Sequence, residues 1–187
     1  QNSRGPIRQT TIIHDLRDLI IKGLLEPGQR LPTRLEIESQ YGVSSVTVQR
    51  ALDQLMRDGF VISRGSLGSF VSQTPPHLYR YALCFGFGPH DDDWSSFYAT
   101  LATEGQALSS STSRRVVSYY NVSGHTDSED YRRLECDLNN HCLAGVIFAH
   151  RIHRLVGSPL MENLKSDRKS TRLNSSHSSV SRMPSSA

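Results

Sequence analysis

Residues 44–55 read SSVTVQRALDQL, and this stretch decides the fold of the first third of the chain. Its apolar residues recur at the three- and four-residue spacing of one helix face: Val48, Ala51, Leu52 and Leu55. Ser44 stands before the first turn as a helix cap, and Gly59 follows the last turn as a stop signal. The stretch therefore predicts an amphipathic helix with one buried and one polar face.

Two further helices are predicted on the N-terminal side of this stretch. The first has an apolar face made of Ile12, Leu16, Leu19 and Ile20. We expect it to be capped by Thr10 or Thr11 and to end at Gly23. Thr33 and Glu36 have the Thr-x-x-Glu spacing of a capping box, which predicts the start of a second, shorter helix.

On the C-terminal side, two short extended segments, 60–63 and 69–72, flank a glycine-bearing turn at 64–68. Three helices followed by such a hairpin predict an α+β winged helix-turn-helix domain over residues 1–73. Residues 74–79 begin Thr-Pro-Pro-His, which predicts a stiff linker that continues neither a strand nor a helix.

The pattern beyond the linker alternates between strand-like and helix-like segments. Strands are predicted at 81–87, 116–120 and 145–149, and helices at 97–109 and 128–139. This alternation predicts a parallel α/β sheet wound with helices on both faces, over residues 80–166.

The polar face of the third helix suits the edges of DNA bases. It carries Ser44, Ser45, Thr47, Gln49 and Arg50. Glutamine pairs with adenine, arginine with guanine, and threonine with either a base or its methyl group. A solvated helix face is the alternative for the same residues. Arg34 beside a capped helix start and Arg64 in the glycine-bearing turn favour phosphate contacts and so favour DNA.

Five motifs in this region match a known family in order. They lie at residues 25–32 (LEPGQRLP), 41–44 (YGVS), 47–52 (TVQRAL), 59–60 (GF) and 68–71 (GSFV). Residues 7–73 thereby resemble GntR-type transcriptional regulators. The resemblance implies a homodimer that binds double-stranded operator DNA, with contacts at Thr33, Arg34, Ser44, Ser45, Thr47, Gln49, Arg50, Gly68 and Ser69.

This chain also departs from the pattern of those regulators. Many relatives have arginine where it has Leu35, Ser45 and Gln49. Fewer cations predict a smaller salt-sensitive contribution to DNA binding.

The second region resembles, more loosely, the opening of LacI-type effector domains, which share the periplasmic sugar-binding fold. The resemblance covers residues 81–106 and 145–164 and implies effector contacts at Trp94, Ser96, Phe97, Ala149 and His150. The loop at 88–96 offers an aromatic ring, hydroxyls and carboxylates, which suit a sugar. A solvated acidic turn with a locally packed Trp94 is the alternative. We expect only the N-terminal part of such a domain within residues 80–166.

These observations predict a regulator of transcription, a repressor, controlled by a small-molecule effector such as a sugar. It would have no enzyme activity, cofactor or metal. A GntR-type N-terminal domain joined to a pyridoxal-phosphate aminotransferase-like domain is the alternative from the enzyme class. Such a domain needs a lysine that forms a Schiff base with the cofactor, and Lys165 is the only lysine between Lys22 and the tail. A third possibility is a different, non-enzymatic ligand domain.

The composition adds few constraints. The net charge of +3 is distributed as +2 over residues 1–76, −2 over 77–166 and +3 over 167–187, so bulk charge alone does not indicate nucleic acid. The cysteines Cys84, Cys136 and Cys142 form no CxxC pair, which favours a reducing cytoplasm over disulfides or a metal site. No apolar run has the length of a membrane span.

The last 21 residues, 167–187, differ abruptly in character and are rich in serine. Back-translation of residues 167–177 and 181–187 resembles a widely used short-read sequencing adapter in one reading frame. We therefore expect a disordered, adapter-derived tail that does not belong to the fold, and a natural protein that continues differently after Ser166.

Overall fold

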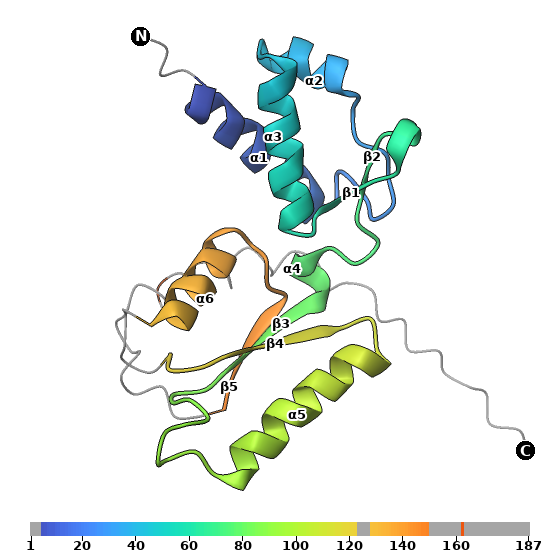
Figure 1. The fold of residues 1–187 in the computed structure, drawn as a ribbon. Coiled ribbons are helices and arrows are strands. Elements are labelled where there is room, and N and C mark those ends of the chain that lie inside the picture. The colour runs from blue at the N-terminus through green and yellow to red at the C-terminus, as the bar shows by residue number, and fades with distance from the viewer. Residues whose placement is uncertain (1–4, 123–127, 150–161, 163–187) are drawn as a thin grey trace, which may run out of the picture.

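The computed structural model describes residues 5–122, 128–149 and residue 162. Its first part consists of α1 (Gly5–Ile21), α2 (Arg34–Tyr41), α3 (Ser45–Arg57), β1 (Val61–Ser63), the short 3-10 helix η1 (Gly65–Leu67) and β2 (Ser69–Val71). The two strands pair antiparallel, with Val61 opposite Val71. Figure 1 shows the three helices packed together with this hairpin beside them. The structure confirms the winged helix-turn-helix arrangement, which we call the N-terminal domain.

Two local predictions are wrong. The helix α1 begins at Gly5, so Thr10 and Thr11 lie inside it and do not cap it. The predicted linker contains a single helical turn, α4 (Pro76–Tyr79). Proline is compatible with the first turn of a helix, where its missing N–H is not needed, and this explains why Pro76 starts a turn that the sequence seemed to forbid.

The core of the N-terminal domain lies between α1 and α3. The predicted apolar face of α3 is buried, from Val48 to Leu55. It belongs to the same apolar cluster as Ile12, Leu16 and Ile20 of α1. Because each of these side chains is at most 3% exposed, the rotation of α3 about its axis is fixed by packing.

The second part, which we call the sheet region, contains β3 (Arg80–Cys84), α5 (Ser96–Ser111), β4 (Arg115–Tyr119), α6 (Glu129–Asn139) and β5 (Gly145–Phe148). The strands form one parallel sheet in the order β4-β3-β5. In Figure 1, α5 and α6 lie on opposite sides of this sheet. The predicted parallel α/β sheet is therefore confirmed, whereas its likeness to periplasmic sugar-binding proteins remains a prediction.

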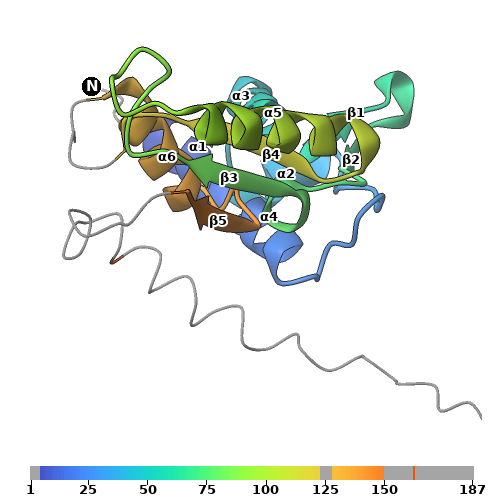
Figure 2. The same cartoon turned by 90° about the horizontal axis from the view of Figure 1, so that it is seen from below.

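Close packing and polar contacts hold the two helices on the sheet. Figure 2 shows α5 running along the strands. Gly105 lets α5 approach closely, since a Cβ atom there would lie 3.2 Å from both Leu83 and Val116 side-chain atoms. On the other face, Arg80 of β3 donates to the Asp137 carboxylate of α6 at 2.9 Å, and the Tyr119 hydroxyl donates to the same carboxylate.

The side chain of Arg17 joins the N-terminal domain to the sheet region. This arginine of α1 is only 2% exposed. Its guanidinium forms an ion pair with Asp58, the residue that follows α3, and donates to Asn140 Oδ1 at 2.7 Å. Asn140 follows α6. One buried cation therefore connects the C-terminal ends of α3 and α6, and losing either partner would leave polar groups unsatisfied.

Apolar and aromatic contacts complete this interface. Cys142, which lies between α6 and β5, is buried in the apolar cluster of the N-terminal domain. The Phe60 ring is fully buried, with the Arg17 guanidinium 5.4 Å from its centroid. The His77 ring of α4 stacks on Phe60 with centroids 5.7 Å apart and planes 11° apart. These contacts seat the N-terminal domain on the sheet region.

His77 makes this interface sensitive to acid. Burial, with a smaller contribution from His141, lowers the pKa of His77 from 6.5 to about 4. Because the folded-state pKa is depressed, the unfolded chain takes up the proton first as the pH falls. The stabilisation due to neutral His77 is therefore complete above about pH 6.5 and is lost progressively down to about pH 4.

We expect the free energy of unfolding to fall more steeply between pH 6.5 and 4.5 in the wild type than in His77→Phe, which keeps a ring against Phe60 but cannot be protonated. Urea unfolding followed by circular dichroism at a series of pH values measures this difference. Equal slopes in the two proteins would contradict a half-buried His77 that is neutral in the folded state.

Asn140→Ala removes the acceptor that faces Arg17. We expect a loss of about 1–3 kcal/mol in the free energy of unfolding, because a buried donor is left without a partner. Gln106→Ala, at an exposed position of α5, is the control and should change stability by less than about 0.5 kcal/mol. An Asn140→Ala protein as stable as this control would show that the contact does not join the two parts.

Candidate nucleic-acid interface

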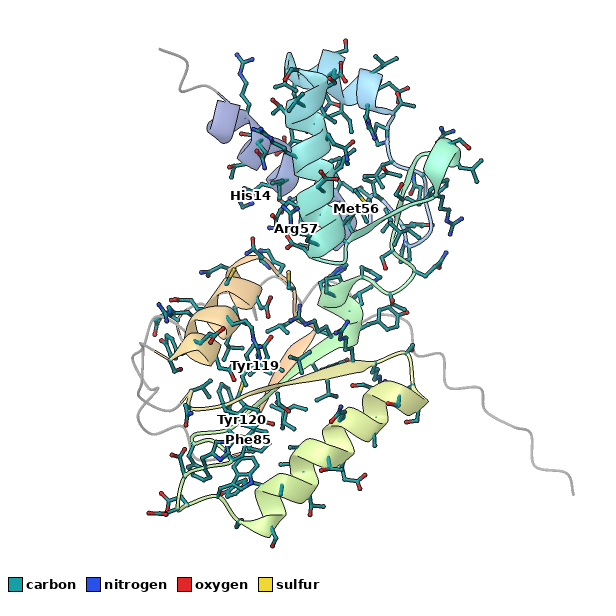
Figure 3. The ribbon with its side chains drawn as sticks, in the orientation of Figure 1. His14, Met56, Arg57, Phe85, Tyr119 and Tyr120 are labelled. Atoms are coloured by element: carbon teal, nitrogen blue, oxygen red, sulfur yellow. The ribbon has the colours of Figure 1, made fainter. Side chains whose placement is uncertain are left out.

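The N-terminal end of α3 lies on the side of the N-terminal domain that points away from the sheet region. In Figure 1, α2 lies beside the N-terminal end of α3, and the sheet region lies at the other end. Figure 3 places Arg57, the last residue of α3, near the sheet region. The first two turns of α3 are therefore the part of the helix that lies away from the sheet region.

The polar residues predicted on α3 differ in what they already contact. Ser45 and Arg50 are exposed. The Gln49 amide donates to the Asp53 carboxylate at 2.6 Å, so that this amide is engaged within the helix. Of the predicted base-reading groups, Arg50 is therefore the one with the longest exposed side chain.

Ser44 and Thr47 form a local pair at the start of α3. Ser44 occupies the N-cap position, but its side chain makes no capping hydrogen bond. Its hydroxyl lies 3.1 Å from the Thr47 hydroxyl instead. The predicted position of Ser44 before α3 is therefore confirmed, but its hydroxyl pairs with that of Thr47 and accepts no hydrogen bond from the first backbone N–H groups of the helix.

The start of α2 carries the predicted capping box. The Thr33 amide donates to the Glu36 carboxylate at 2.6 Å, and the Glu36 amide donates to the Thr33 hydroxyl at 3.3 Å. Hydrogen bonds from the Thr33 backbone and hydroxyl lower the pKa of Glu36, and the positive charge of Arg30 lowers it further. Thr33 therefore orients the helix start, and the neighbouring Arg34 is exposed in its first turn.

The wing consists of β1, η1 and β2, and two guanidinium groups lie against it. The Arg64 guanidinium lies over the Phe70 ring, 4.7 Å from its centroid. Arg30 pairs with Phe70 through a backbone bridge, and its guanidinium lies 3.4 Å from the position of a Cβ atom on Gly68. Gly68 has φ of +102°, a conformation that side chains rarely adopt, so glycine is needed there for the wing to close.

The start of α2 and the wing border one small cavity of about 120 Å³. It is lined by Arg30, Leu31, Pro32, Thr33, Arg34, Leu52, Ser63, Gly65, Gly68 and Ser69. The structure therefore brings together four of the predicted contact residues: Thr33, Arg34, Gly68 and Ser69. Arg30 was missed by the sequence analysis, since its place depends on the pairing of residue 30 with β2.

The predicted effector residues that the structure describes follow the carboxyl ends of the sheet strands. Cys84 at the end of β3 pairs with Phe148 at the end of β5, so the segments that follow both strands share this edge. Ala149 directly follows β5, and its amide donates to the Cys84 carbonyl at 2.9 Å. Phe97, in the first turn of α5, is 64% exposed. His150 lies outside the described residues.

Trp94 packs into a group of aromatic rings. Its ring lies 5.2 Å from Phe85, 5.7 Å from Tyr120 and 5.8 Å from Tyr98, measured between centroids. Figure 3 shows Phe85 and Tyr120 together beneath Tyr119. Asp91, in the same loop as Trp94, accepts a hydrogen bond from the Gly88 amide at 2.5 Å. The arrangement fits local packing of Trp94 in the loop, whereas the predicted effector residues Ser96 and Phe97, in the first turn of α5, are exposed.

The three cysteines do not converge. Cys84 and Cys142 are buried and Cys136 is exposed. Burial raises the pKa of both buried thiols to about 12, so that they are neutral at physiological pH. Within the part of the chain that the structure describes, no group of three or more His, Cys, Asp or Glu side chains could hold a metal ion.

Residues 8–71 match the family model of the bacterial regulatory proteins of the gntR family. The chain is 38% identical over 61 residues to the probable fructoselysine utilization operon transcriptional repressor of Escherichia coli K12, covering 33% of this chain and 25% of that protein. It is 38% identical over 58 residues to the mannosyl-D-glycerate transport/metabolism system repressor MngR of the same organism, covering 31% of this chain and 24% of MngR.

Among solved structures, the AraR DNA-binding domain in complex with operator ORR3 is 29% identical, with a TM-score of 0.34. The match covers 35% of this chain and 78% of that chain. The chain spans about a quarter of the length of the two curated relatives named above.

Proposed function

We propose that this chain, whose residues 8–71 form a winged helix-turn-helix domain of the gntR type, is a sequence-specific DNA-binding regulator of transcription. The observation that carries the proposal is the fixed rotation of α3. Its apolar stripe is held on α1, and its other face presents Ser45 and Arg50 to solvent. A helix with its side chains has about the width of the major groove, and residues near the start of such a helix contact base edges.

The cations of the wing and α2 are suited to the sugar-phosphate strands that flank the groove. Among the described residues, none of Arg30, Arg34 and Arg64 forms an ion pair with a carboxylate. Guanidinium groups without an internal partner can pair with phosphate oxygens at two points. In this proposal they position the domain on the duplex, while α3 reads the sequence.

We further propose that a small molecule, a sugar or a related metabolite, binds at the carboxyl edge of the sheet and controls DNA binding. In parallel α/β sheets, ligands bind beyond the carboxyl ends of the strands. Trp94, Ser96, Phe97 and Ala149 follow those ends, and His150 adjoins them in sequence. Two relatives are repressors named for fructoselysine and for mannosyl-D-glycerate, which supports both the sugar class and repression.

A homodimer in the cytoplasm completes the proposal. Two copies place two α3 helices on half-sites about one helical turn apart, and a ligand that changes their spacing changes operator affinity. In the described residues, no helix combines the length and the apolar character that crossing a membrane requires. The aminotransferase-like alternative is not favoured, because the named relatives are transcriptional repressors.

Arg50→Ala should weaken binding to a selected duplex by about tenfold or more, since tenfold corresponds to about 1.4 kcal/mol, within the about 1–3 kcal/mol that a bidentate arginine–guanine contact contributes. The duplex is selected from a randomised pool with the full chain, and the dissociation constant is measured by gel shift. Arg57→Ala changes an exposed arginine of the same helix at the end near the sheet region and should change affinity less than about twofold. Failure to select any duplex in dilute salt would contradict the proposed function.

Arg30→Gln should weaken binding to all duplexes by a similar factor and leave base preferences unchanged. The slope of log affinity against log salt should become shallower by about one, because one phosphate contact is lost. Fluorescence anisotropy at several salt concentrations measures the slope. If the slope is unchanged, Arg30 does not contact phosphate.

A further inference from the structure

The side chain at the centre of the exposed face of α3 is apolar. Each residue of an α-helix advances by about 100° around the axis. The buried stripe runs through Val48, Ala51, Leu52 and Leu55. The direction opposite to this stripe is occupied by Val46, with Arg50 one turn further along. Val46 is 57% exposed, and it was not among the residues that the sequence analysis assigned to DNA.

Val46 does not serve the stability of the folded chain in this position. A β-branched side chain has restricted rotamers in a helix and a lower helix propensity than alanine. More than half of the Val46 surface is exposed to solvent, so the partial burial of this side chain contributes little to the stability of the fold. An alanine at this position would stabilise an isolated helix better.

The polar side chains next to Val46 make hydrogen bonds to one another and not across the Val46 side chain. The Ser44 and Thr47 hydroxyls face each other, and the Gln49 amide is turned to Asp53 one turn further along. Val46 and Arg50 are four residues apart and are therefore neighbours on the exposed face of α3, and the Ser44, Thr47 and Gln49 groups are directed elsewhere. A surface of this kind matches a base step that offers a hydrogen-bonding edge next to an apolar one.

The C5-methyl of thymine is the apolar group that a base pair presents in the major groove. We propose that Val46 recognises the 5-methyl group of a thymine next to the base that Arg50 contacts. This inference rests on the proposed function, since it requires α3 to lie in the major groove. It adds a base-specific apolar contact, which would set a thymine preference at one position of each half-site.

The test uses the duplex selected with the full chain. Each thymine is replaced in turn by deoxyuridine, which lacks only the methyl group, and dissociation constants are measured by fluorescence anisotropy. One replacement per half-site should weaken wild-type binding by about three- to tenfold, the effect of losing one buried methyl-sized contact. Val46→Ala should bind the thymine duplex more weakly by a similar factor and be insensitive to that replacement.

Two controls separate the possible failures. Leu108→Ala removes an exposed apolar side chain of α5 and should retain the full deoxyuridine effect. Val46→Ala should have a thermal stability equal to or above that of the wild type, so that its effect is not one of unfolding. If the wild type binds the duplex but no replacement matters, or if Val46→Ala remains as sensitive as the wild type, the inference is overturned. If no duplex is bound at all, the proposed function itself fails.

Discussion

The packing of α3 on α1 is the constraint on which the rest depends. The stripe from Val48 to Leu55 meets Ile12, Leu16 and Ile20, and these side chains are almost completely buried. Turning α3 by a quarter of a turn would expose several of them, at a cost of roughly 1.5–3 kcal/mol for each large side chain. The packing of the core therefore determines which residues of α3 are exposed.

The same helix is held at its far end by Arg17. Its ion pair with Asp58 and its hydrogen bond to Asn140 connect the ends of α3 and α6 through one buried side chain. Cys142 of the sheet region and His77 of α4 extend the contact to the core of the N-terminal domain. A displacement of the segment between α6 and β5 would therefore alter contacts at the C-terminal end of α3. This end is opposite to the end that meets DNA in our proposal.

Much of this fold could be predicted from the sequence, and the reasons for success and failure differ by residue. The spacing of apolar residues in 44–55 defined α3, and the Thr33–Glu36 spacing defined the start of α2, because both signals are local. The roles of Ser44 and Gln49 could not be foreseen in the same way. Their side chains have several possible partners within one helical turn, and the structure selects Thr47 and Asp53.

Contacts between distant segments were the other part that sequence patterns could not supply. Arg17 has the sequence context of a surface residue, and its burial depends on Asn140, which is 123 residues away. Arg30 joins the wing only because its backbone pairs with Phe70. Trp94 follows an acidic stretch, but its surroundings are rings contributed by Phe85, Tyr98 and Tyr120. Each of these depends on tertiary packing that no short pattern contains.

The central claim, that α3 lies in the major groove, is tested most directly by methylation interference on a selected duplex. Dimethyl sulfate modifies guanine N7 in the major groove and adenine N3 in the minor groove, so one experiment reports on both. The account predicts that methylation of one or more guanines in each half-site prevents binding. Interference confined to adenines, with every guanine tolerated, would contradict it.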